Sequence, residues 1–298
     1  MQSGALSAAL AFALWGLFPL YFKAVEAVPP REMMGWRIAC TLAFVALLLG
    51  SQRRHAWLGP ALVNRRLMLG FAASASLIAF NWFLYIWAVV NGRVLDASLG
   101  YFINPLVNVL LGAAVLKERL RPAQWLAVAV AGAGVAWLGW QTGEPPWIAI
   151  TLAITFGIYG LLRKTAPLGP LEGLAMETLM LGPIALTGLA WLLMQGRSEF
   201  VHQGFWLQAL VLASGPITAI PLLLFASGAR RIPMSVLGLL QYIAPSVQLL
   251  LGVLLFGETF TPERLIGFAV IWAALAIYSA ESWWRSRRAA LPVSAPPR

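Results

Sequence analysis

The sequence predicts an all-α integral membrane protein with ten transmembrane helices, on three observations. The chain of 298 residues is 60% hydrophobic and only 11% charged, whereas soluble domains carry about a quarter charged residues. Apolar runs of about 20 residues, long enough to cross a hydrocarbon core about 30 Å thick, recur along the chain. The longest loop between them, 51–66, is too short to hold a soluble domain.

The spans follow one another in order along the chain. The first has no positive charge before it and is too long for the h-region of a signal peptide, so we expect a retained helix. The second contains Cys40, the only cysteine, which excludes an intrachain disulfide and gives no sign of a metal cluster. The ten predicted spans are 4–25, 32–50, 67–90, 96–116, 123–141, 146–163, 172–195, 205–229, 232–256 and 263–284.

The basic residues predict the orientation of these spans. The net charge is +10, but the positive residues do not form one patch, so nucleic acid is not an expected partner. With the N-terminus inside, fifteen Lys and Arg residues lie on the inner side, and this bias predicts that both termini are cytoplasmic. Arg37 belongs to neither side, because it lies within a span. The five on the outer side are Lys23, Arg31, Arg93, Arg197 and Arg264.

The chain also repeats itself. The ten predicted spans divide into two repeats of five. Because five is an odd number, the chain must enter the second repeat from the side of the membrane opposite to the first. We therefore predict a first repeat at 1–141, a second, inverted repeat at 142–284, and a basic cytoplasmic tail at 285–298. Inverted repeats are typical of secondary transporters, whose substrate site lies near the midplane between the halves. A shift of 140 positions places Pro105 on Pro245, Gly112 on Gly252, Glu118 on Glu258 and Pro122 on Pro262.

Two symmetry-related spans carry polar stripes with a proline. Pro105 and Pro245 are predicted helix kinks. We expect the stripes to line a midplane cavity, with the amides of the two halves facing each other; the alternative is that the amides join helices. The stripe residues are Tyr101, Asn104 and Asn108 in the fourth span, and Gln241, Tyr242 and Gln248 in the ninth.

Other deep polar or aromatic residues are further candidates for the cavity. Large aromatic side chains can stack on a substrate or gate its path, although tryptophans near span ends are typical of the interfacial belt. The candidates are Trp15 in the first span, Asn81, Trp82 and Tyr85 in the third, and Tyr159 in the sixth.

Arg37 and Glu177 are opposite charges at equivalent positions of the two repeats. A charge within a membrane is costly unless it is paired or faces a wet cavity. One interpretation is a structural ion pair between the halves, and the other is a substrate or proton site. On the second interpretation, Glu177 is the leading carboxylate for proton coupling. Glu118 and Glu258, at helix ends, are interpreted as capping residues.

Three stretches resemble a known family. "ALWGLFPLYFK", "NWFLYIWAV" and "DASLGYFINPLVNVLLG" are similar to the drug/metabolite transporter superfamily, EamA type, RarD group. The resemblance implies a bacterial inner-membrane protein, with helices 1–4 and 6–9 around a central cavity and helices 5 and 10 peripheral, where they offer a homodimer contact. The RarD group carries the label "chloramphenicol-sensitive protein". Within the repeat, Asn104 falls on Ala244, so the halves do not offer identical polar groups.

The leading functional hypothesis is a secondary-active transporter that exports a small metabolite, amino acid or drug-like solute by alternating access. A gradient-driven exchanger or facilitator of the same solutes is the alternative, and a non-transporting scaffold is a further one. No Walker-type loop is present and no cofactor is expected. An enzyme is disfavoured because His55 and His202 lie in loops and no HExxH or GxSxG motif occurs. The expected partners are a small-molecule substrate and the lipid bilayer.

Overall fold

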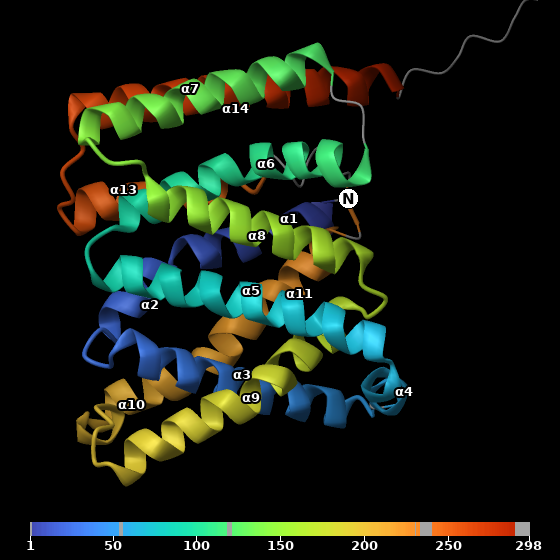
Figure 1. The fold of residues 1–298 in the computed structure, drawn as a ribbon, viewed down its shortest axis with the longest axis vertical. Coiled ribbons are helices and arrows are strands. Elements are labelled where there is room, and N and C mark those ends of the chain that lie inside the picture. The colour runs from blue at the N-terminus through green and yellow to red at the C-terminus, as the bar shows by residue number, and fades with distance from the viewer. Residues whose placement is uncertain (1, 54–55, 118–120, 230, 233–239, 290–298) are drawn as a thin grey trace, which may run out of the picture.

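The computed structural model describes residues 2–53, 56–117, 121–229, 231–232 and 240–289, and within them every regular element is a helix (Figure 1). The predicted all-α class is therefore confirmed for this part of the chain. The α-helices are α1 (Gln2–Gly16), α2 (Phe18–Ala24), α3 (Pro30–Ser51), α4 (Leu58–Val63), α5 (Arg65–Val90), α6 (Val94–Leu116), α7 (Pro122–Thr142), α8 (Trp147–Thr165), α9 (Pro170–Met194), α10 (Phe205–Leu212), α11 (Ser214–Ala229), α13 (Ile243–Leu250) and α14 (Pro262–Ala289). A 3₁₀ turn, η1 (Phe200–His202), and a π-helical turn, η2 (Leu251–Leu255), complete the set.

Several helices begin at a proline, which needs no hydrogen-bond acceptor in the first turn because it has no N–H group. These are α3 at Pro30, α7 at Pro122, α9 at Pro170 and α14 at Pro262. Helix α5 begins differently, since the backbone N–H of Leu67 donates to the side-chain oxygen of Asn64 at 3.1 Å. Local sequence thus determines where the long helices begin.

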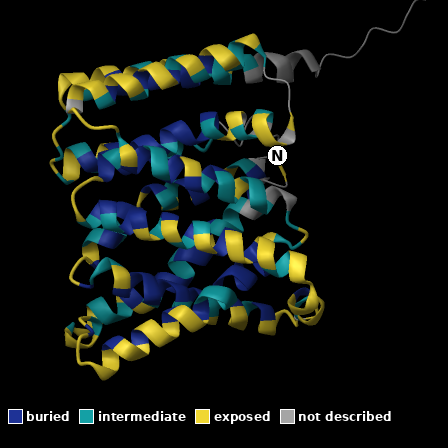
Figure 2. Ribbon diagram, viewed as in Figure 1, coloured by how far each residue is buried: buried dark blue, intermediate teal, exposed yellow. Residues whose placement is uncertain are grey.

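Eight helices in the described residues are long and apolar enough to cross a membrane. Shorter apolar helices, Trp147–Arg163 and Ile243–Leu255, lie where the sixth and ninth spans are predicted. Buried residues gather in the middle of the bundle while exposed ones lie along its outer helices (Figure 2). Large apolar side chains such as Trp140 and Leu254 are exposed there, as expected for a surface that faces lipid. The chain is a multi-pass membrane protein, and the count of ten spans stays a prediction.

Proline interrupts two of the predicted spans. The first is divided into α1 and α2 at Leu17, and the eighth into α10 and α11 at Ala213. Pro19 has no N–H to donate to the carbonyl of Trp15, which a continuous helix would require. The Gln248 side chain donates to that carbonyl instead, at 3.2 Å. The side-chain amide of Gln248 therefore connects α13 to the end of α1, where the first span is interrupted.

The two prolines predicted as kinks lie in different surroundings. Pro105 lies inside α6, as expected for a kink. Pro245 is the third residue of α13, which begins at Ile243 after a turn at 241–242. In a first turn a missing N–H breaks no hydrogen bond within the helix. Pro245 therefore shapes a helix start rather than the interior of one.

Segments far apart in sequence pack side by side. Helix α7 packs with α14, α6 with α8, α1 with α11, and α3 with both α9 and α11. In Figure 1, α7 and α14 lie together at one end of the molecule, and α3, α9 and α10 at the other. Glycine allows the closest contacts: a Cβ on Gly100 of α6 would lie 2.8 Å from the Ala149 carbonyl oxygen of α8. Such small residues let membrane helices approach each other closely.

Candidate functional site

Arg37 is the basic residue that the sequence places within a span, and it is buried in the middle of the bundle. It lies on α3, and its side chain is only 3% exposed. Its Nε donates to the Thr218 hydroxyl of α11 at 3.0 Å. Its guanidinium lies 4.2 Å from the ring centroid of Trp82 on α5, a cation–π contact. The position and plane of this charge are thus fixed by two neighbouring helices.

No carboxylate in the described part of the chain neutralises the guanidinium of Arg37. Among the described residues, no carboxylate lies within 4.0 Å of it, and its Nη1 has no hydrogen-bond partner. The polar neighbours that interact with its charge are the hydroxyls of Tyr21, Tyr85 and Tyr101. Tyr85 is itself buried, and its hydroxyl has no partner. Arg37 therefore presents unpaired donors in a setting of neutral side chains.

A series of aromatic contacts leads away from Arg37 across the bundle. Its guanidinium lies 5.5 Å from the ring of Phe22 on α2, and Phe22 contacts Tyr85 with ring centroids 5.9 Å apart. The series continues from Tyr85 to Tyr101 at 5.7 Å, to Phe156 at 6.1 Å and to Tyr159 at 5.9 Å. These residues come from α2, α5, α6 and α8. We call the five residues Phe22, Tyr85, Tyr101, Phe156 and Tyr159 the aromatic series.

Glu177 of α9 lies at the other end of the aromatic series. The Tyr159 hydroxyl donates to its Oε2 at 3.2 Å, and the Ser74 hydroxyl of α5 donates to its Oε1 at 2.7 Å. Arg163 of α8 forms an ion pair with it, with 3.8 Å between Nε and Oε1. The carboxylate is 1% exposed. In contrast to Arg37, Glu177 has an opposite charge and two hydroxyl donors beside it.

These contacts show that Arg37 and Glu177 do not form an ion pair with each other. Glu177 pairs with Arg163, and Arg37 bonds to Thr218. The Arg37–Thr218 bond and the Ser74–Glu177 bond nevertheless join the two predicted repeats, since Arg37 and Ser74 belong to the first and Thr218 and Glu177 to the second. The two charges are separate sites.

The predicted amides differ in their bonding. The Asn81 side-chain nitrogen donates to the Leu152 carbonyl at 3.0 Å and to the Thr155 hydroxyl at 2.8 Å, which joins α5 to α8. Asn104 is 1% exposed, and within the described residues neither its nitrogen nor its oxygen has a partner. The Gln248 nitrogen is used on Trp15, whereas its oxygen has none. The Asn81 nitrogen therefore connects two helices, although its oxygen has no partner among the described residues, and Asn104 makes no such connection there.

The remaining residues predicted to line the cavity lie in different parts of the structure. Asn108 is exposed, and its side-chain oxygen lies beside Gly157 of α8 rather than toward α13. Trp15 packs against Phe12 and Phe225, with ring centroids 5.5 and 5.6 Å away. Gln241 and Tyr242 lie in the turn before α13. The expectation that Asn108 faces the amides of the ninth span is therefore not met.

Three residues of these two sites were not among the sequence candidates. Thr218 gave no signal, because a hydroxyl in an apolar helix commonly bonds to its own backbone. Arg163, the last residue of the sixth predicted span, was counted among the basic residues of the inner side, yet its side chain reaches Glu177. Ser74 could have been found, since the 140-residue shift places it on Ser214.

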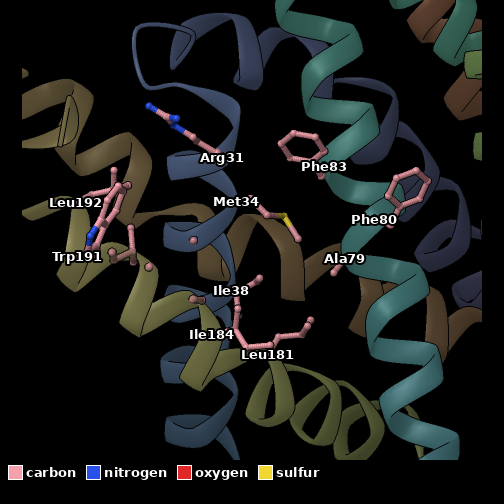
Figure 3. Close-up of a pocket in the computed structure, with 14 residues that line it drawn as sticks. Arg31, Met34, Ile38, Ala79, Phe80, Phe83, Leu181, Ile184, Trp191 and Leu192 are labelled. Carbon is pink, nitrogen blue, oxygen red and sulfur yellow. The ribbon is translucent and has the colours of Figure 1, made fainter. Parts of the chain in front are cut away.

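One hollow of the structure lies away from both charges. It has a volume of about 530 Å³ and lies between α3, α5 and α9. Apolar side chains dominate its walls, with Arg31 at one end and Trp191 of α9 across from Phe80 and Phe83 of α5 (Figure 3). A second hollow, of about 350 Å³, includes Tyr242 beside α14. Neither is lined by any other predicted cavity residue.

Comparison with known proteins places this arrangement in a family. The EamA-like transporter family matches residues 2–140 and again 146–280. An uncharacterised transporter of Pseudomonas aeruginosa is 47% identical, covering 98% of each chain, and the protein RarD of Streptomyces exfoliatus is 44% identical over 99% of this chain and 94% of its own. A solved protein structure covers 94% of this chain and 98% of its own with a TM-score of 0.60 at 21% identity, which supports the fold. The chain is a membrane transporter that belongs to the EamA-like transporter family, and within it to the RarD group.

Proposed function

We propose that the protein is a secondary-active transporter that exports a small metabolite, amino acid or drug-like solute through the centre of the bundle by alternating access. The observation that carries this proposal is a group of buried polar atoms with no protein partner. Among the described residues they include Nη1 of Arg37, the hydroxyl of Tyr85 and both polar atoms of the Asn104 side chain. In a structural role such atoms would be paired. In a membrane protein, unpaired ones indicate a path for solute or water.

The helix packing supports an inverted repeat as the basis of alternating access. Each of the first five predicted spans has an equivalent among the last five, so that the first corresponds to the sixth, the second to the seventh, and so on. If every helix in a packed pair is replaced by its equivalent, the α1–α11 pair becomes α8–α5, and α1–α13 becomes α8–α6. The same exchange converts α3–α11 into α9–α5, whereas α3–α9, α6–α13 and α7–α14 map onto themselves. All of these pairs occur. Two family matches of similar length agree with this exchange. We therefore place ten spans in two inverted halves that rock against each other.

The charge distribution supports the remaining placement. The positive-inside bias favours both termini on the cytoplasmic side of a bacterial inner membrane. Helices α7 and α14 pack together, and both expose large apolar side chains, such as Trp125 and Trp140 of α7 and Leu265 and Ile266 of α14. That surface suits lipid or a second copy of the chain, and a homodimer contact there stays a prediction.

We assign proton coupling to Glu177. It is a buried carboxylate on α9 that receives hydrogen bonds from α5 and α8, so a change in its charge would alter contacts with two neighbouring helices. Arg163 lies near enough to stabilise the ionised form. Loss of that charge on protonation would weaken the link between these helices, which is a way to couple a proton to rocking.

Transport is tested directly with purified protein in liposomes. Vesicles with and without protein are loaded with a metabolite extract, and solutes that leave are identified by mass spectrometry under an imposed proton gradient. We expect at least one small organic solute to leave faster from vesicles that contain protein. Equal release from both preparations, with a folded and correctly inserted protein, contradicts transport.

A further inference from the structure

We infer that the transported solute carries a single carboxylate that binds to Arg37, with an apolar or aromatic body that lies against the aromatic series. This inference rests on the proposed transport function and narrows it to one class of substrate. It follows from the difference between two of the buried charged residues, Arg37 and Glu177.

Charge is the first step. Glu177 has Arg163 beside it, but Arg37, which is equally enclosed, has no carboxylate within 4.0 Å among the described residues. A cation within a membrane protein without a counter-charge is unfavourable, and such residues mark substrate or ion pathways. One guanidinium calls for one negative charge. A monoanion therefore suits this site.

Geometry is the second step. The Nε of Arg37 is held by Thr218, and one face of the guanidinium is covered by Trp82. Phe18 and Phe22 lie 5.6 and 5.5 Å from its central carbon. With Nε and the planar face occupied, the donors left are at the Nη end, where Nη1 is unpaired. An arginine presented in this way matches the two oxygens of a carboxylate.

The neighbouring hydroxyl is the third step. Tyr85 is 3% exposed, its hydroxyl has no partner, and it is among the groups that interact electrostatically with Arg37. A phenol can donate to a carboxylate oxygen, but it does not neutralise a guanidinium. Two unpaired, buried donors on α3 and α5 are thus available to one anion.

The body of the solute is the fourth step. Trp82 and Phe22 border the guanidinium, and Tyr101 lies next to Tyr85. Rings in this arrangement favour apolar or aromatic groups over strongly hydrated ones. A small carboxylate with an apolar or aromatic body satisfies both the charge and the walls.

Binding is measured on the full-length protein in lipid nanodiscs, with phenylacetate as the probe and its neutral analogue phenylacetamide as the matched control. The readout is the temperature of unfolding at increasing probe concentration and constant ionic strength. We expect phenylacetate to raise this temperature in a saturable way and phenylacetamide to leave it unchanged. An equal rise with both probes, or no rise with either, overturns the inference.

Variants locate the binding. Arg37→Gln is expected to lose the response to phenylacetate, whereas Arg197→Gln, which removes an exposed arginine after the end of α9, is expected to keep it. Tyr85→Phe removes only a hydroxyl that bonds to nothing in the protein, so it should fold, and we expect about tenfold weaker apparent affinity. If Arg37→Gln does not fold, the Tyr85→Phe result decides. An unchanged affinity in Tyr85→Phe, or a response in Arg37→Gln that equals the wild type, contradicts the site.

Flux in liposomes separates this inference from the proposed function. If phenylacetate binds through Arg37 but no solute crosses, the site stands and transport fails. If solutes without an acidic group are transported, and Arg37→Gln transports them as well as the wild type, transport stands and the inference fails.

Discussion

Arg37 and Glu177 lie 140 positions apart, at equivalent places in the two halves, and each is bonded to a helix of the opposite half. Arg37 donates to Thr218 at 3.0 Å, and Glu177 accepts from Ser74 at 2.7 Å. The equivalence ends with their partners, because Glu177 has Arg163 beside it and Arg37 has no carboxylate within 4.0 Å among the described residues. Symmetry has produced two buried sites of opposite charge, of which one is compensated. The two sites therefore suit different tasks.

Replacing Glu177 by Gln should remove the pH dependence of transport. The amide keeps the size of the side chain and still accepts a hydrogen bond from Ser74, but it cannot exchange a proton. Flux into or out of proteoliposomes is measured across a series of pH values. Ser76→Ala is the matched control, because Ser76 is exposed and bonds only to its own helix at Ala72. A pH profile in Glu177→Gln that follows the wild type refutes proton coupling at this residue.

Replacing Thr218 by Val should weaken substrate binding without removing a charge. Valine has nearly the same shape, and the lost hydroxyl frees the Nε of Arg37, so the guanidinium is no longer held in one orientation. We expect a rise of about tenfold in the solute concentration for half-maximal flux, the scale of one hydrogen bond to a charged group. Thr187→Val serves for comparison, since Thr187 is exposed and bonds only to its own helix. Equal flux curves for wild type and Thr218→Val would show that this bond has no positioning role.

Glu258 should be more sensitive to Ala than to Gln. Its two carboxylate oxygens accept the first backbone N–H groups of α6, from Val94 at 2.6 Å and from Leu95 at 2.9 Å. Ala leaves both donors unpaired and should destabilise the protein by about 1–2 kcal/mol, the usual scale for a lost helix cap. Gln keeps one acceptor and should cost less. The measurement is the unfolding midpoint in detergent with increasing denaturant. Comparable midpoints for Glu258→Ala and wild type would mean that this cap contributes nothing to stability.

Glu258 should also give the protein a measurable dependence of stability on pH. Burial raises the pKa of this carboxyl above its usual value, and the two backbone N–H donors oppose that shift in part. A folded-state pKa above the unfolded one means that the folded protein binds more protons. Its contribution to stability is therefore full below the unfolded pKa and is lost as pH rises through the folded pKa. The decline in unfolding temperature over this pH range should be shallower in Glu258→Gln than in the wild type. Parallel curves of unfolding temperature against pH for the two proteins would contradict the assignment of this pH dependence to Glu258.

The spans were predictable because the length and apolarity of a run are local properties, whereas the partners of a polar residue depend on the helix that packs beside it. Asn81 and Asn104 are equivalent by sequence, as amides deep in apolar runs. Only packing shows that the Thr155 hydroxyl and the Leu152 carbonyl accept from the first, and that the second has no hydrogen-bond partner among the described residues. The break at Leu17 is similar. Pro19 predicts a missing hydrogen bond, but not that Gln248, more than 200 residues later, takes its place.

These two asparagines provide the sharpest test of whether buried polarity serves structure or transport. In Asn81→Leu the protein loses two hydrogen bonds between α5 and α8 and leaves the Leu152 carbonyl without the amide donor, so we expect a loss of about 1–3 kcal/mol in the free energy of unfolding. In Asn104→Leu no bond within the protein is lost, because neither amide atom has a partner. Burying an apolar side chain of similar size there should leave stability unchanged or raise it. Flux should fall, since the path loses a polar group. The pair is measured by denaturant unfolding and proteoliposome flux on the same preparations. A destabilised Asn104→Leu protein would assign Asn104 to structure, and a stable protein with full flux would assign it neither role. In both cases the solute path would have to lie elsewhere than along this face of α6.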